Sequence, residues 1–142
     1  MFADPFPSKH QLLQACRAEP ALDHPILHCA HELTALHEQL LCAPASPPTE
    51  SDARRATLIA EIDRWTTSQL PPSHGSASIH TETLGAVIDR LAHRTTTAYA
   101  ALTTQGDWNL WDAWERLAEL AIGYADLTTD LTTGRRRLPG GP

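Results

Sequence analysis

Apolar positions recur at helical spacing along most of the chain, and this pattern predicts five helices. We expect them over residues 9–18, 23–42, 52–69, 79–103 and 108–133. Proline-rich stretches at 43–51 and 70–78 are predicted to be loops, and no stretch alternates like a strand between turn signals. Four long helices with short connections favour an all-α fold, an antiparallel helical bundle of four long helices plus a short N-terminal helix.

The length of 142 residues suits one folded domain. We expect an N-terminal extension over 1–8 and a single helical domain over 9–134. The remaining residues, 135–142, read RRRLPGGP and are predicted to form a flexible tail.

The predicted helix over 79–103 is the most informative segment of the chain. One side carries an ordinary aliphatic stripe, whereas the opposite side carries Glu82, Asp89 and His93 among small residues such as Gly85 and Ala92. A solvated helix face usually carries long charged side chains at most positions. Small residues instead allow a second helix or a ligand to approach the backbone. We therefore expect this helix to be covered on both sides, with some of its charges in a cleft or an interface.

Three residues of this helix are candidates for catalysis. Glu82 and Asp89 are seven residues apart, which corresponds to roughly 10–11 Å along a helix and is too far for a shared proton. Glu82 or His80 is the candidate general base, and Asp89 is expected to orient Arg90 or His93. The alternative is that Glu82 and Asp89 pair with arginines on neighbouring helices and hold the bundle in register.

Four further residues are candidates for substrate binding: Arg90, Arg94, His37 and His93. Arg90 and Arg94 lie one helical turn apart, and together they can grip a carboxylate, phosphate or sulfate group. His93 follows Asp89 by one turn. His37 falls in the middle of the apolar stripe of the helix over 23–42, where it is either a hydrogen-bonded core residue or a wall of the site.

Histidines are frequent in the helix over 23–42, and the spacing of His24, His28 and Glu32 suits metal ligands. However, HExxH is absent, and so are the repeated ExxH motifs of di-iron bundles. The three cysteines also lack the close pairing of zinc sites. We expect no metal and no cofactor; a metal or ligand sensor built on these histidines rests on composition alone.

Charge and hydropathy limit the classes of partner. The net charge of −6 argues against a general nucleic-acid binder, which is usually basic. No apolar run approaches the ~20 residues that span a bilayer, and the N-terminus lacks the features of a signal peptide. We therefore expect a cytoplasmic protein that binds neither nucleic acid nor membrane. One lysine among eleven basic residues indicates a GC-rich genome, such as an actinobacterial one.

The segment IHTETLGAVIDRLA at 79–92 resembles the signature of a bacterial family, domain-of-unknown-function family 4254. Three other segments are similar to its actinobacterial members: DHPILHCAHELTALHE at 23–38, EIDRWTTSQLP at 61–71 and WERLAELAIGYADLTTDLTTGRRRLP at 114–139. The likeness covers about residues 10–139. It implies a small, soluble, helical bacterial protein and brings no established reaction or catalytic residue. The occurrence of members near specialised-metabolite and polysaccharide genes hints at small-molecule biosynthesis.

Two functions follow as expectations. The first is an enzyme, or the catalytic part of one, that acts on an anionic small molecule by general acid/base chemistry: an elimination, a cyclisation or a hydrolysis. The alternative is a non-catalytic partner subunit that stabilises a catalytic chain in a hetero-oligomer. For a protein partner or a homo-oligomer, we expect contact through the Gly85/Ala92 face and the tryptophans Trp108, Trp111 and Trp114.

Overall fold

The computed structural model describes residues 4–42, 49–73, 75–103 and 107–140, apart from the side chains of residues 49, 107 and 108. Within these ranges it has five helices, which confirms the all-α class: α1 (Lys9–Ala15), α2 (Pro25–Cys42), α3 (Thr49–Gln69), α4 (Leu84–Ala101) and α5 (Asp107–Thr133). Two short strands complete it, β1 (Ser78–Ile79) and β2 (Arg136–Arg137). No described helix is both long and apolar enough to cross a membrane.

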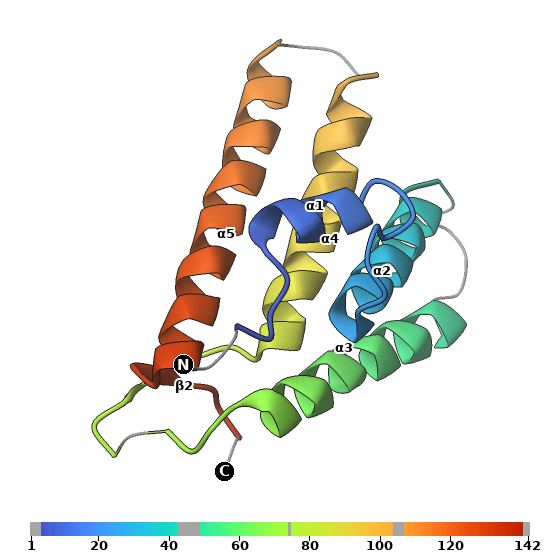
Figure 1. Cartoon of the computed structure of the whole chain (residues 1–142). Coiled ribbons are helices and arrows are strands. Elements are labelled where there is room, and N and C mark those ends of the chain that lie inside the picture. Colours follow the sequence, from blue (N-terminus) through green and yellow to red (C-terminus); the bar gives the residue numbers. More distant parts are fainter. Residues whose placement is uncertain (1–3, 43–48, 74, 104–106, 141–142) are drawn as a thin grey trace.

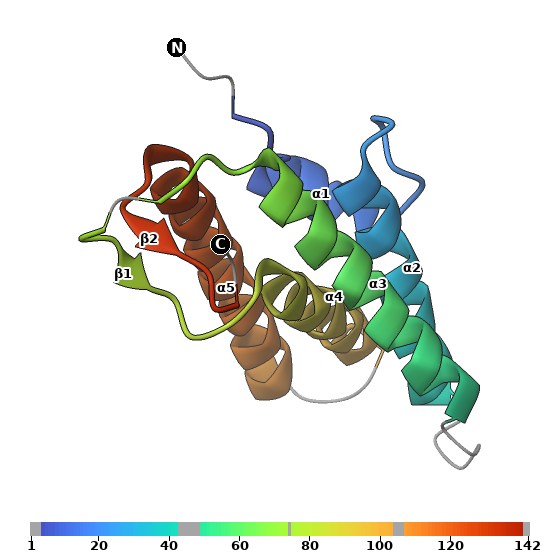
Figure 2. The same ribbon diagram turned by 90° about the horizontal axis from the view of Figure 1, so that it is seen from below.

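Helix α4 is the central element of the fold, since α2, α3 and α5 all pack against it. Figure 1 shows α4 and α5 side by side, with α3 crossing at a different inclination, and Figure 2 shows the same arrangement from below. The short helix α1 packs on both α2 and α5. The regular antiparallel arrangement of four helices therefore remains a prediction, whereas the helical class is established.

Helix α4 is buried on two sides, as the sequence indicated. Its buried residues include the aliphatic stripe and also residues of the opposite face: Leu84, Gly85, Val87, Ile88, Asp89, Leu91, Ala92, Thr95, Thr96 and Ala98. At Gly85 the backbone of α4 approaches α3 closely, and its N–H donates to Asp63 Oδ1 at 2.8 Å. A Cβ at Gly85 would lie 2.6 Å from the carbonyl oxygen of Ile59. The small residue is therefore required by the packing of α3 on α4.

The start of α4 differs from the prediction. The periodic pattern placed the helix start at residue 79, but the helix begins at Leu84. Thr83 is the N-cap, with extended backbone and a hydroxyl that accepts a hydrogen bond from the Ala86 N–H at 3.2 Å. Glu82 therefore precedes the helix, so the two-turn geometry expected for Glu82 and Asp89 is wrong.

The residues before α4 pair with the C-terminal segment, which corrects the expectation of no strand. Ser78 and Ile79 lie parallel to Arg136 and Arg137, and β2 follows a turn at Gly134, whose φ of 77° favours glycine. Leu138 packs against the core. The segment predicted as a flexible tail thus contains a paired strand and a residue that packs on the core.

The described part of the N-terminal extension also joins the fold. Phe6 is buried, and its ring packs edge-on against Trp65 with the centroids 5.8 Å apart. The buried hydroxyl of Tyr124 donates to the carbonyl oxygen of Pro7 at 2.7 Å. These contacts tie residues before α1 to α3 and α5.

Candidate functional site

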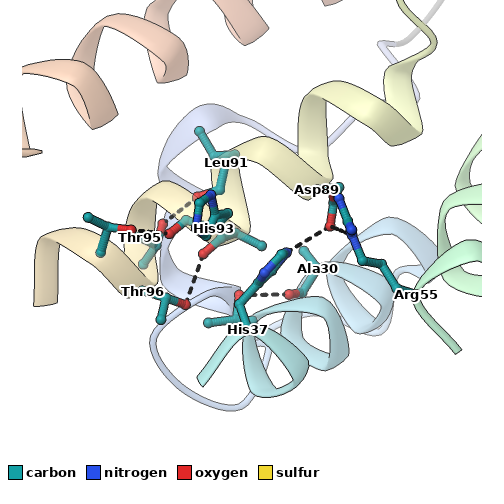
Figure 3. A network of polar contacts seen from close by, with 11 residues as sticks. Ala30, His37, Arg55, Asp89, Leu91, His93, Thr95 and Thr96 are labelled. Carbon is teal, nitrogen blue, oxygen red and sulfur yellow. Dashed lines mark hydrogen bonds and ion pairs between the residues drawn. The ribbon is translucent and has the colours of Figure 1, made fainter. Parts of the chain in front are cut away.

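Asp89 is the centre of a buried polar cluster formed by three helices. Its carboxylate accepts a hydrogen bond from His37 Nε2 of α2 at 2.8 Å. Arg55 of α3 donates to the same carboxylate from Nε, at 3.0 Å and 3.1 Å, and from Nη2 at 2.6 Å. Figure 3 shows His37 and Arg55 meeting at the carboxylate of Asp89. The cluster therefore joins α2, α3 and α4 through one carboxylate.

These contacts determine the ionisation of Asp89. Burial alone would raise the pKa of its carboxyl group, but the hydrogen bonds from His37 and Arg55 and the charge of Arg55 outweigh burial. They lower the pKa to about 2. An ionised carboxylate only accepts hydrogen bonds, so His37 must carry its proton on Nε2. Asp89 is consequently a poor proton acceptor near neutral pH, and its position matches the alternative in which it pairs with an arginine of a neighbouring helix.

His93 lies next to this cluster and, unlike Asp89, is exposed to solvent. Its ring centroid is 5.0 Å from that of His37, and the two rings are tilted by 37°. Partial desolvation of the ring lowers the pKa of His93, and the charge of His37 lowers it further, while Asp89 acts in the opposite direction. The lowered pKa of His93 favours its neutral imidazole, which is the form that accepts a proton.

Glu82 and Arg90 form an ion pair beside the cluster. Both side chains are partly exposed, at 33% for Glu82 and 41% for Arg90. The alternative expected for Glu82, pairing with an arginine of a neighbouring helix, is not what the structure shows, because Arg90 belongs to α4, the helix that Glu82 precedes. This pair is accessible, so a ligand can exchange with either partner.

An open pocket of about 310 Å³ brings these groups together, and we call it the α4 pocket. Five of the seven candidate residues line it: His37, Glu82, Asp89, Arg90 and His93. The sequence analysis missed Arg55, Ile59 and Ala86, which also line it. Arg55 had a detectable signal, because it lies three residues before Leu58 and seven before Ile62, on the apolar stripe of α3.

The other two candidate residues lie elsewhere. The backbone N–H of His80 donates to the carbonyl oxygen of Arg137 at 2.8 Å. The ring Nδ1 of His80 lies 3.4 Å from Nη1 of Arg136. His80 thus belongs to the β1–β2 pairing and does not line the α4 pocket. Arg94 lines two open grooves between α4 and α5, where Asp112 and Arg116 are its neighbours.

The residues expected to bind a partner also differ from the prediction in their exposure. Gly85 packs against α3 and Ala92 is fully buried, so this chain itself covers the Gly85/Ala92 face. Trp114 is half-buried and packs edge-on against Tyr99, with ring centroids 5.1 Å apart. Trp111 is 67% exposed, and the side chain of Trp108 lies outside the described residues.

The remaining histidines of the second helix region have structural contacts. His24 Nδ1 accepts the N–H of Ile26 at 3.1 Å, and its Nε2 lies 3.0 Å from the carbonyl oxygen of Pro5. His28 pairs with Asp23, and His31 Nδ1 lies 3.0 Å from the carbonyl oxygen of Ala15. In the described part of the chain, no group of three or more histidine, cysteine, aspartate or glutamate side chains is placed to hold a metal ion.

The geometry defines an all-helical protein with an ion-paired, histidine-lined pocket at its central helix; such a fold does not by itself specify a reaction. The model of the family described as "Protein of unknown function (DUF4254)" matches residues 49–139. The chain belongs to this family. The match runs from α3 to β2, so it includes Arg55 and the whole of α4, whereas α2 with His37 lies outside it. No curated protein and no solved structure matches the chain.

Proposed function

We propose that the α4 pocket binds a small anionic molecule and that His93 acts on it as a general base. The observation that supports this proposal is the exposed imidazole of His93, whose pKa is lowered by partial desolvation, in a pocket that also contains two guanidinium groups. Cations orient an anionic ligand and stabilise negative charge that develops as a proton is removed. Elimination, cyclisation and hydrolysis each require such a proton transfer.

The two arginines contribute differently to anion binding. Arg55 donates to Asp89 through Nε and Nη2, yet 43% of its side chain is exposed. Its Nη1 has no protein partner among the described residues, so that donor is available to a ligand. Among the described residues Arg90 forms an ion pair with Glu82 alone, and an incoming carboxylate or phosphate can replace that partner. We infer that Arg90 binds the anion directly and that Arg55 adds a second positive charge beside it.

These roles revise the expected catalytic assignments. Asp89 holds Arg55 and His37 in place instead of the expected Arg90 or His93, so we treat it as a positioning residue. Glu82 keeps Arg90 oriented through their ion pair, and His80 has no part in the pocket. The wider setting that the family resemblance suggested, small-molecule biosynthesis in a bacterial cytoplasm, belongs to the same proposal.

Anion binding is tested by titrating inorganic phosphate into the protein and following backbone amide signals by NMR. Wild-type signals around Ala86 and His93 should shift. The Arg90→Gln variant should bind phosphate about tenfold more weakly, the loss of one charge-assisted contact. Arg116→Gln is the matched control, because Arg116 already pairs with Asp112 outside the pocket. Equal weakening in both variants, or no response near Ala86, would contradict the proposal.

The general-base role of His93 needs a separate measurement. Pyruvate in D₂O exchanges its methyl protons when a base removes one of them, and its carboxylate provides the anionic group. We expect the wild-type protein to accelerate this exchange and His93→Gln to lose most of the acceleration, with phosphate binding retained. Equal exchange rates with wild type and His93→Gln would remove the general-base assignment.

The second candidate function, a partner subunit, is supported by the outer face of α5. Trp111 and Ile122 are eleven residues apart, which places them on one side of the helix, and they are 67% and 52% exposed. Exposed aromatic and branched residues are typical of interfaces. Light scattering on a sizing column distinguishes the two functions. A monomer whose mass and solubility are unchanged by Trp111→Ser would argue against the subunit role.

A further inference from the structure

A second pocket lies at the opposite end of α3 from residue Arg55. It has a volume of about 150 Å³, and we call it the C-terminal pocket. One wall is the end of α3 and the loop that follows, including Leu70 and Pro71. The other wall is the end of α5 and the C-terminal strand, with Leu131, Arg136, Arg137 and Leu138. It shares no residue with the α4 pocket, so nothing in the proposed function uses it.

The walls of this pocket select an apolar group of limited size. Leu70, Pro71, Leu131 and Leu138 supply hydrocarbon, and Leu131 is only 3% exposed. An apolar cavity of about 150 Å³ is large enough to bind a benzene molecule. The space therefore fits a single aromatic ring or a short branched alkyl group, and it is too small for a long acyl chain.

The arginines of β2 supply the charge for the other end of the ligand. Arg136 already has partners within the protein, since its Nε donates to Asp130 Oδ2 at 2.9 Å and its Nη1 lies 3.4 Å from His80 Nδ1. Arg137 lines the same pocket and has no carboxylate partner among the described residues. A guanidinium group at an apolar pocket favours a ligand that carries a carboxylate beside its apolar part.

The pocket is also held in shape by its neighbours. The N–H of Arg135 donates to the carbonyl oxygen of Asp130 at 2.9 Å, which fixes the turn between α5 and β2. The pairing of Ile79 with Arg137 then fixes the strand. A preformed site binds a small ligand without a large ordering cost.

We propose that the C-terminal pocket binds a small carboxylic acid with a single aromatic ring or a short branched alkyl group, with the carboxylate on Arg137. The ligand's apolar group would contact Leu70, Leu131 and Leu138. This site is independent of the proposed function, and either proposal can fail without the other.

The proposal is tested with benzoate as the probe, followed by NMR of the full chain. Benzoate should shift the methyl signals of Leu131 and Leu138, whereas acetate, which lacks the apolar group, and benzamide, which lacks the charge, should bind much more weakly. Absence of these shifts at about 10 mM benzoate, a concentration that would reveal millimolar affinity, would overturn the proposal.

Variants separate a specific contact from a general attraction of anions. Arg137→Gln should weaken benzoate binding about tenfold and leave benzamide binding almost unchanged. Arg135→Gln removes the same charge from an exposed neighbour that does not line the pocket, and it should have little effect. Equal losses in the two variants would overturn the proposal. So would benzoate shifts that vanish in Arg90→Gln, because they would place benzoate in the α4 pocket.

Discussion

Replacing Gly85 with alanine tests the contact that positions α4 on α3. An added Cβ would lie 2.6 Å from the carbonyl oxygen of Ile59, 2.7 Å from Asp63 Oδ1 and 2.9 Å from Ile59 Cγ2. Two of these neighbours belong to Ile59, including its backbone, so a rotation of one side chain cannot relieve the clash. Helix α3 would have to move by roughly 0.8 Å to restore an ordinary contact of 3.4 Å.

The size of the effect follows from two losses. Overpacking of this kind costs about 1–3 kcal/mol. The displacement also weakens the 2.8 Å hydrogen bond from the Gly85 N–H to Asp63, and a buried donor left without its partner costs about 1–3 kcal/mol. The usual gain from replacing a helical glycine by alanine offsets about 0.5–1 kcal/mol. We expect Gly85→Ala to lower the free energy of unfolding by about 1–5 kcal/mol.

Gly123→Ala is the matched control, because α5 leaves nothing within 4 Å of its added Cβ. This variant should gain about 0.5–1 kcal/mol from helix propensity alone. Urea unfolding followed by circular dichroism gives both free energies, and an unchanged m value shows that the two-state comparison holds. A Gly85→Ala variant as stable as wild type, or as stable as Gly123→Ala, would refute the close approach of α3 and α4.

Three further predictions concern Asp89, His93 and Tyr124. Asp89→Asn should cost about 3 kcal/mol at neutral pH, because Arg55 and His37 lose a buried charged partner. The pKa of Asp89 is about 2 in the folded protein, below its usual 3.8. Urea unfolding should therefore show the stabilisation by ionised Asp89 intact above about pH 4 and lost as the pH falls toward 2. The pKa of His93 is also lowered in the folded state, so the unfolded chain takes up a proton more readily and protonation below the usual pKa of 6.5 favours unfolding. Acidification from about pH 7.5 to 5 should therefore destabilise His93→Gln less than it destabilises the wild type. Tyr124→Phe removes the buried hydrogen bond to Pro7, and thermal or urea unfolding should show a loss of about 1–2 kcal/mol.

The helical class and the coverage of α4 on two sides follow from local patterns. Apolar residues that recur every three or four positions identify a helix, because this spacing places them on one helix face. The small residues of α4 correctly indicated that both of its faces are covered. His37 was recognised as a candidate because a histidine interrupts the apolar stripe of its helix. Arg55 interrupts the stripe of α3 in the same way, and the two interruptions meet at Asp89.

The errors arose where distant segments decide the local structure. Residues Ile79 and His80 have helical periodicity, yet Ile79 pairs with Arg137 and the N–H of His80 donates to the carbonyl oxygen of Arg137. No local pattern reveals a strand of two residues whose partner lies near the C-terminus. The location of His80 away from the α4 pocket follows from the same pairing. A periodic pattern also cannot distinguish a face covered by a partner from one covered by the chain's own helix, as Gly85 and Ala92 show.

In the proposed function, the α4 pocket offers a neutral imidazole beside cations that bind an anion. The most direct measurement is the pKa of His93, followed by NMR of the histidine ring signals with and without inorganic phosphate. We predict a pKa below the usual 6.5 in the free protein and a higher pKa when phosphate occupies the pocket, because a bound anion stabilises the imidazolium. A pKa at or above 6.5 in the free protein, or one that phosphate leaves unchanged, would contradict the account.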